Sequence, residues 1–146
     1  MEQRQMKILW IDDDISRFKL QPYIDEFEDN GFEIIKVSNP DDVEENIAGN
    51  DDIRCVILDI SMPTGKKVSS ELAKRGMRTG LLILKKLQED PMLEFIKKVV
   101  FTIVTDDEVR RYCQEHGIHH FKKQEYVADT FIEKIKKIIG ESRYDG

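Results

Sequence analysis

Short apolar runs alternate with segments of helical period along the whole chain. This alternation is typical of βα units wound around a parallel sheet. The first predicted strand, residues 7–11, is almost continuously apolar, as expected where helices cover both faces of the sheet. Four more strands are predicted at 32–37, 55–59, 99–104 and 118–122. The pattern therefore predicts five βα units.

The predicted helices differ in how clearly their ends are marked. Residues 15–30 have an apolar face that includes Ile15 and Phe18. Pro22 removes a backbone hydrogen bond there, so we expect a kinked helix or one that starts late. Shorter helices are predicted at 43–48, 81–88 and 106–116. The last helix has the clearest apolar face, formed by Val127, Phe131, Ile135, Ile138 and Ile139.

An insertion of sixteen residues, 64–79, interrupts the βα pattern after the third strand. Ser69-Ser70 could cap a short helix that Gly76 would end. A solvated loop is the more common explanation of such a segment, and a binding surface is the alternative. Glu71 is its one acid, against five basic residues: Lys66, Lys67, Lys74, Arg75 and Arg78.

Length and charge narrow the function classes. We expect 146 residues to form a single domain, 1–146, with a polar tail at 140–146 and no room for an output domain. The net charge of −6 argues against direct binding to nucleic acid. No apolar run approaches the roughly 20 residues of a membrane span. The polar start lacks a signal-peptide pattern, and Cys55 and Cys113 form no CxxC motif, so we expect a cytoplasmic protein.

Polar and acidic side chains follow the predicted strands. The carboxyl ends of parallel strands meet at one edge of a sheet, where ligands collect. Neighbouring carboxylates there repel by about 4 kcal/mol a pair at an intermediate dielectric, so they need a cation, and oxygen ligands favour Mg²⁺. One carboxylate could then attack phosphorus, with a lysine and a hydroxyl holding the phosphoryl oxygens. The residues in question are Asp12-Asp13-Asp14, Asp59, Thr102 or Thr105, and Lys122 or Lys123.

Each of these residues also has a simpler explanation. Asp12-Asp13-Asp14 could be a polar turn that caps a helix, and Asp59 alone could be a solvated strand end. The acidic run and Asp59 at a second strand end together favour the functional interpretation. The histidines are poor candidates for metal ligation, because adjacent strand residues point to opposite faces and no second ligand pair accompanies them. They are His116, His119 and His120.

Two motifs resemble the receiver domain of two-component response regulators, over nearly the whole chain. They are ILWIDD at 8–13 and VILDISMP at 56–63, and together they are far more specific than either alone. The resemblance implies a flavodoxin-like (βα)₅ fold with strand order 2-1-3-4-5. It also implies that Asp59 accepts a phosphoryl group, that Asp13 binds Mg²⁺ directly and Asp12 through water, and that Ser61 adds its backbone carbonyl.

The sequence departs from the receiver pattern at several positions. Gly80 takes the place of the glycine that follows Met-Pro, but only after the insertion. Thr102 matches the switch hydroxyl, with Thr105 as the alternative. Ile103 stands where the family favours a small residue. The lysine position is filled by Gln124 in an ungapped match, with Glu125 at a proline that is usually cis, whereas a one-residue deletion places Lys123 there. Tyr126 takes an aromatic position often exposed for partner recognition.

These implications define the expected function. We expect Mg²⁺-dependent transfer of a phosphoryl group from a histidine kinase or phosphotransfer protein to Asp59, which then changes the surface that binds a downstream protein. Such a receiver assists its own phosphorylation and dephosphorylation but is not otherwise an enzyme. The alternative is a pseudo-receiver that acts as a phosphorylation-independent interaction module. A hydrolase is disfavoured, because Ser61 stands where it would need an acid.

Overall fold

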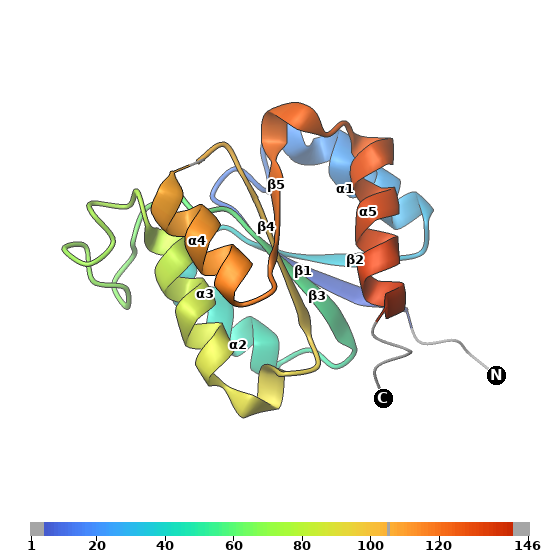
Figure 1. Ribbon diagram of the computed structural model, residues 1–146. Helices are drawn as coiled ribbons and strands as arrows, with labels where there is room; N and C mark the ends of the chain where they lie inside the picture. Colours follow the sequence, from blue (N-terminus) through green and yellow to red (C-terminus); the bar gives the residue numbers. More distant parts are fainter. Residues whose placement is uncertain (1–4, 105, 142–146) are drawn as a thin grey trace.

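In this computed structural model, which describes residues 5–104 and 106–141, five parallel strands form one sheet (Figure 1). The order β2-β1-β3-β4-β5 confirms the predicted order 2-1-3-4-5. Each observed strand lies within two residues of its predicted bounds. The strands are β1 (Lys7–Ile11), β2 (Glu33–Val37), β3 (Ile53–Leu58), β4 (Lys97–Thr102) and β5 (His119–Lys122).

Helices cover both faces of the sheet (Figure 1). α1 (Gln21–Asp29) and α5 (Ala128–Glu141) lie together on one face, and α2 (Val43–Ala48), α3 (Thr79–Glu89) and α4 (Asp107–Glu115) cover the other. Short 3₁₀ turns precede or follow several elements. They span Phe18–Leu20, Pro40–Asp42, Pro91–Leu93 and Lys123–Glu125. Within the described ranges, no helix has the length and apolar character that crossing a membrane requires.

The side chains of β1 divide the core into two parts. Ile8 and Trp10 point towards α1 and α5, while Leu9 and Ile11 point towards the opposite face. Both faces are buried, which explains the continuous apolar run of this strand. Beneath α5, Trp10 meets an aromatic cluster in which Phe101 of β4 stacks on Phe131 with ring centroids 4.0 Å apart. The sheet is therefore a rigid platform for the residues at its edge.

The late start expected for the helix that contains Pro22 is confirmed, whereas two residues assigned to apolar helix faces are exposed. Pro22 lies in the first turn of α1, so the helix starts late, at Gln21, and the preceding residues form a 3₁₀ turn. Phe18 in that turn is 91% exposed rather than buried. Val127 is 67% exposed and lies just before α5 instead of on its apolar face. In both cases the apolar residues with helical spacing begin before the first residue of the helix.

The predicted short helix in the insertion does not form. Ser69 Oγ accepts a hydrogen bond from the Leu72 backbone N–H (3.2 Å). The chain then enters the left-handed region at Lys74 and Arg75, with φ of 51° and 57°, so a right-handed helix cannot continue. The segment is instead a series of turns closed at its base, where the Met62 N–H donates to the Gly76 carbonyl (3.0 Å).

Candidate functional site

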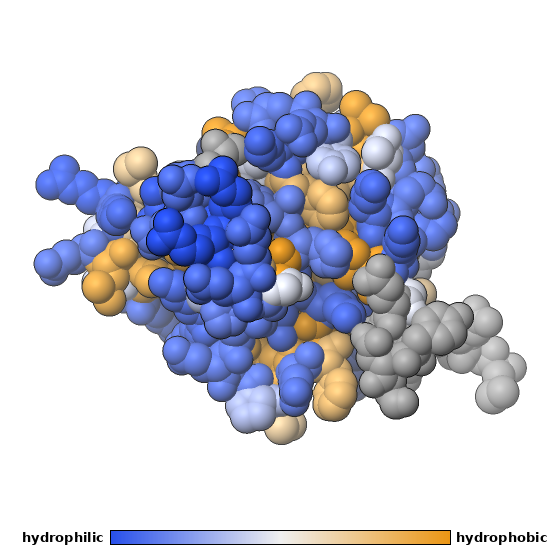
Figure 2. Space-filling view, viewed as in Figure 1, coloured by the Kyte–Doolittle hydropathy of each residue, from blue (hydrophilic) through white to orange (hydrophobic). Residues whose placement is uncertain are grey.

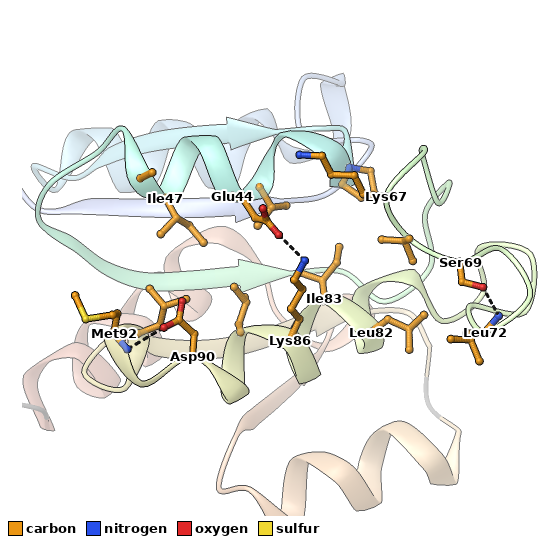
Figure 3. A pocket seen from close by; sticks show the side chains of 16 residues that line it. Glu44, Ile47, Lys67, Ser69, Leu72, Leu82, Ile83, Lys86, Asp90 and Met92 are labelled. Atoms are coloured by element: carbon orange, nitrogen blue, oxygen red, sulfur yellow. Dashed lines mark hydrogen bonds and ion pairs between the residues drawn. The ribbon is translucent and has the colours of Figure 1, made fainter.

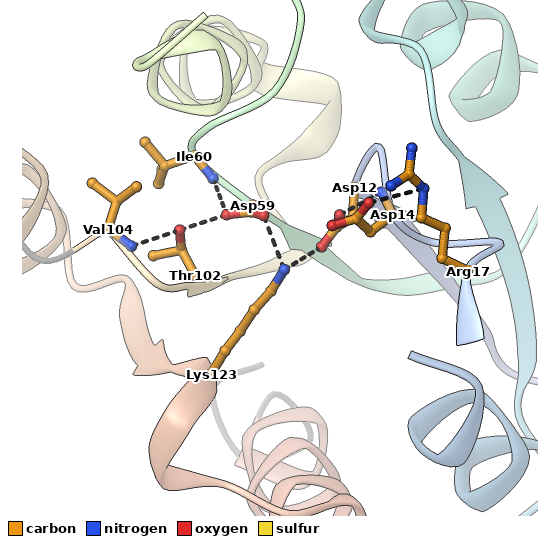
Figure 4. Close-up of polar contacts among 8 residues, drawn as sticks. All are labelled: Asp12, Asp14, Arg17, Asp59, Ile60, Thr102, Val104 and Lys123. Carbon is orange, nitrogen blue, oxygen red and sulfur yellow. Dashed lines mark hydrogen bonds and ion pairs between the residues drawn. The ribbon is translucent and has the colours of Figure 1, made fainter. Parts of the chain in front are cut away.

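Four strands bring polar side chains to one edge of the sheet (Figure 4). Asp12 follows β1, Asp59 follows β3, Thr102 ends β4 and Lys123 follows β5. All four strands are parallel, so their carboxyl ends lie side by side. The structure thus brings together the four positions that the sequence predicted for this edge.

Asp59 is at the centre of this group and is only 6% exposed. Its Oδ1 accepts hydrogen bonds from the Ile60 N–H (2.7 Å) and from the Thr102 hydroxyl (2.5 Å). Its Oδ2 is 2.9 Å from Nζ of Lys123. Three donors from three segments therefore fix the orientation of one buried carboxylate (Figure 4).

Lys123 links the two most buried carboxylates. Its Nζ is 2.8 Å from Oδ2 of Asp12 and 2.9 Å from Oδ2 of Asp59. Burial lowers the pKa of Lys123, but Asp59 and Asp12 raise it by more, so the ammonium stays charged. Burial raises the pKa of Asp12 to about 6, against the opposing effect of Lys123 and with a further rise from Asp59. One lysine thus compensates two buried acids only in part.

The acidic run after β1 fits a divalent cation. Asp12, Asp13 and Asp14 each offer a carboxylate oxygen, and these atoms lie within 4.8 Å of one another. Burial raises the pKa of Asp13, and Asp14 and Asp59 raise it further. Asp14 also pairs with Arg17 at 3.2 Å. Oxygen ligands with excess negative charge are the set that Mg²⁺ prefers, so these residues could hold it.

A cavity of about 450 Å³ opens beside these acids. Four of the six residues predicted for the metal and for phosphoryl transfer line it, namely Asp13, Asp59, Ser61 and Lys123. Asp12 and Thr102 are buried beside it and do not line it. Ile103 also lines the cavity and is 59% exposed at its mouth. The space beside Asp59 is thus partly bounded by a branched apolar side chain.

Gly80 explains how the insertion returns to the site. A Cβ built on Gly80 would lie 1.8 Å from the backbone oxygen of Asp59, and its N–H donates to the Ile60 carbonyl (2.8 Å). Only glycine fits this close approach. Gly80 therefore allows the start of α3 to approach the backbone that follows β3.

The alternatives for the lysine lie elsewhere. Lys122 points away and is 3.8 Å from Glu125 on the surface. Gln124 lines the cavity but is exposed, and no hydrogen bond with a described residue ties its side chain to Asp59. Every peptide bond in the described ranges is trans, including those of the 3₁₀ turn that begins at Lys123. Thr105, the alternative hydroxyl, lies outside the described residues.

Two contacts near the site were not predicted. The Val104 backbone N–H donates to Oγ1 of Thr102 (3.1 Å), which connects the hydroxyl to the segment before α4. The Tyr23 hydroxyl donates to the Tyr126 carbonyl (2.5 Å), while the Tyr126 ring packs on Phe121 and is half-buried. Backbone donors and contacts between distant elements leave no pattern in the sequence, so neither could be found there.

Comparisons with known proteins identify the fold. No protein-family model matches the sequence, and no curated protein matches it. Solved structures do: a response regulator receiver domain protein (CheY-like) from Methanospirillum hungatei JF-1 is 21% identical, with a TM-score of 0.70 over 98% of this chain and 100% of that one. A two-component response regulator from Clostridium difficile is 20% identical, with a TM-score of 0.69 over 92% and 96%.

A third similar structure is the chemotaxis protein CheY4 from Vibrio cholerae. It is 17% identical, with a TM-score of 0.69 over 92% of this chain and 98% of that one. All three matches cover nearly the whole chain. The resemblance to receiver domains that the two acidic motifs indicated is confirmed at the level of the fold.

Proposed function

We propose that this receiver-type fold accepts a phosphoryl group on Asp59 from a phosphohistidine of a histidine kinase or phosphotransfer protein. The observation that carries the proposal is the position of Lys123, whose Nζ lies within 2.9 Å of the carboxylates of both Asp12 and Asp59. A buried carboxylate with a charged lysine and a hydroxyl on it has the groups that phosphoryl transfer requires.

The residues have separate roles in the proposed transfer. One oxygen of Asp59 forms the new O–P bond as the P–N bond breaks, and the imidazole leaves after taking up a proton from solvent. The Ile60 N–H holds the carboxylate in position. Asp13, Asp59 and the Ser61 carbonyl would hold Mg²⁺, with Asp12 acting through water. When bound, Mg²⁺ supplies positive charge that offsets the acids and the incoming phosphoryl oxygens.

Thr102 and Lys123 connect phosphorylation to a change of surface. Both now donate to the free carboxylate of Asp59. After transfer, each would donate to phosphoryl oxygens instead. Because Thr102 also accepts the Val104 N–H, its movement would displace the segment before α4. The surface of α4, β5 and α5 would then present a new face to a downstream protein.

The chemistry of the cysteines fits a reducing compartment. Cys55 and Cys113 are buried free thiols, and burial raises the pKa of Cys55 to about 12 and that of Cys113 to about 11. Such thiols are unreactive. Free cysteines are compatible with the reducing cytoplasm, which is the compartment that we propose for this function.

Intact-mass measurement after incubation with Mg²⁺ and acetyl phosphate, or with a phosphorylated histidine phosphotransfer protein, tests the proposal. We expect one added phosphoryl group on the wild type and on Asp51→Asn, an exposed control acid. Asp59→Asn should gain none, and Asp13→Asn should need far more Mg²⁺. Lys123→Ala should lower the rate or leave the surface unchanged after transfer.

Absence of an adduct with every donor would overturn the proposal and favour the pseudo-receiver. Ile103 is the observation behind that alternative, because it narrows the space beside Asp59. If Ile103 is the obstacle, Ile103→Ala should restore phosphorylation by the small donor. A pseudo-receiver would remain unmodified in this variant as well.

A further inference from the structure

A groove of about 660 Å³ separates α2 from α3, far from the acidic site. Its floor is apolar and includes Val43, Ile83 and Leu87, which belong to the buried core. Ile47 of α2 and Leu82 of α3 form opposite walls and stay partly exposed (Figure 3). On the other face of the sheet, by contrast, α1 lies directly along α5.

The insertion extends this groove beyond the sheet. Lys67, Val68, Ser69 and Leu72 line its end, so the additional residues form part of the wall. The carboxylate of Asp41, in the 3₁₀ turn that precedes α2, holds the loop in place by accepting the Lys66 N–H (2.8 Å) and the Lys67 N–H (2.7 Å). Hydrogen bonds therefore attach this wall of the groove to the turn that leads into α2.

Large apolar side chains lie exposed at both ends of the groove. Leu72 in the insertion is 70% exposed, and Met92, which follows α3, is 85% exposed. Figure 3 shows them at opposite ends. Figure 2 shows a mostly hydrophilic surface with apolar areas over the insertion and near the C-terminal end of α3. An elongated apolar partner along the groove would cover both side chains.

Charge on the rim is uneven along the groove. In the middle, Lys86 of α3 pairs with Glu44 of α2, and both side chains are exposed (Figure 3). In the insertion, Arg78 and Lys74 pair with Asp106 and Glu108 of the α4 segment. No ion pair with a described residue engages the remaining cations, which are Lys66, Lys67 and Arg75. Of these three, only Lys67 lines the groove, while Asp90 lines the end near Met92. The insertion end is therefore the more positive of the two ends, although the Asp41 carboxylate near Lys67 reduces this charge.

We infer that this groove is a docking site for an amphipathic helix of a partner protein, with an apolar stripe on the groove and acidic residues against Lys67. A helix suits the shape, because the groove lies between two helices and is apolar along its length. A small-molecule site would need polar groups that converge on the ligand. Here the polar groups, such as Glu44 and Lys86, lie on the rim.

Two synthetic helical peptides of about 18 residues would test the inference. Both carry the same Leu/Ile stripe, but one has Glu and the other Lys on the flanking positions. With the ¹⁵N-labelled protein, the acidic peptide should shift the amide signals of α2, α3 and the insertion. Leu72→Ser and Met92→Ser should each weaken its binding by about fivefold to tenfold. Lys67→Glu should weaken it by a similar factor, and less so at high salt.

Matched control variants distinguish binding in the groove from nonspecific binding to exposed apolar or charged side chains. Phe95→Ser removes an apolar side chain that is 88% exposed but does not line the groove. Lys137→Glu reverses an exposed charge on α5. Both variants should bind like the wild type, and the wild type should bind the peptide without Mg²⁺ or a phosphodonor, which separates this inference from the proposed phosphorylation. Signal mapping on the wild type remains decisive if a groove variant does not fold.

Three outcomes would overturn the inference. Equal affinity for the basic peptide would remove the role of the insertion charge. Shifts confined to α4, β5 and α5 would place the peptide on another surface. Self-association through the groove, detected by sedimentation with no peptide binding, would make a second copy of the chain the occupant.

Discussion

Lys123 is the cation that the two buried acids of the site share. Its ammonium touches two carboxylates that have little contact with water, since Asp12 is fully buried and Asp59 nearly so. The net charge of these three side chains is −1 when both acids are ionised. A site held in this state is stabilised by a further cation or by a proton.

Asp12 should make the stability of the metal-free protein depend on pH. Its pKa is raised from 3.8 to about 6, mainly by burial, so the native state binds more protons than the unfolded state between these values. The free energy of unfolding should therefore fall as the pH rises from about 4 to about 6, by up to about 3 kcal/mol. Asp12→Asn should remove this fall, as measured by urea unfolding in EDTA.

Asp51→Asn is the control for that measurement, because Asp51 is exposed. It should follow the wild-type curve. Adding Mg²⁺ at pH 7.5 should stabilise the wild type more than Asp12→Asn. A wild-type stability that rises steadily from pH 4 to 6 without metal would contradict the assigned cost of burying Asp12.

The strand ends that form the site could be predicted from the sequence, but most of the individual contacts between their side chains could not. Asp12, Asp59 and Thr102 each end or follow a strand, so strand order alone brings them close together. The choice between Lys122 and Lys123 depends on where β5 ends. The 3₁₀ turn after Lys122 directs the next side chain inwards, and one residue decides which amine meets Asp59.

At the scale of elements, the junction between β3 and α3 tolerates an insertion because close contacts hold the two ends of the inserted loop together. The Thr79 hydroxyl donates to the Met62 carbonyl (2.5 Å), and Gly76 and Gly80 allow the backbones to approach. The loop can thus lengthen without moving Asp59. The turns inside it could not be predicted, because positive φ at Lys74 and Arg75 is unusual for such residues.

Substitution of Gly80 should show how tight this junction is. In Gly80→Ala the new methyl group would overlap the Asp59 backbone oxygen, which cannot move without displacing the proposed phosphoacceptor. We expect a loss of about 1–3 kcal/mol in the free energy of unfolding. Gly140→Ala in α5 meets no atom within 4 Å and should instead gain about 0.5–1 kcal/mol. Equal effects in chemical denaturation would show that the approach at Gly80 is not restrictive.

The insertion is also tied to α4 by two ion pairs that should differ in strength. Arg78 is mostly buried against Asp106, with a side chain only 12% exposed, whereas Lys74 and Glu108 are exposed. Double-mutant cycles measure each coupling energy. For Arg78→Leu with Asp106→Ser, which keeps a helix cap, we expect about 1–3 kcal/mol. For Lys74→Ala with Glu108→Ala we expect less than about 1 kcal/mol.

Coupling energies below about 1 kcal/mol in both cycles would contradict this ranking and show that solvent screens both pairs alike. The insertion would then have no strong side-chain link to α4. Such a loop could move independently of the segment before α4.

At the scale of the whole molecule, these contacts form one connected route from the acidic edge to the groove. Asp59 contacts Thr102, whose hydroxyl accepts the Val104 N–H. Asp106, two residues further on, caps α4 and pairs with Arg78 of the insertion. The same insertion forms one wall of the groove beside α2. A change at Asp59 can therefore reach a surface on the α2 and α3 side of the sheet.

This route predicts which amide signals the proposed phosphorylation of Asp59 should shift. Amide signals should shift in the segment before α4 and in the insertion, because both are connected to Thr102. The signals of α1 and β2 should shift little, because these elements are not part of the route. Arg78→Leu should keep the shifts near α4 but reduce those of the insertion, while Lys137→Glu leaves both unchanged. Insertion shifts of full size in Arg78→Leu would contradict the route, since coupling would then bypass the Asp106 pair.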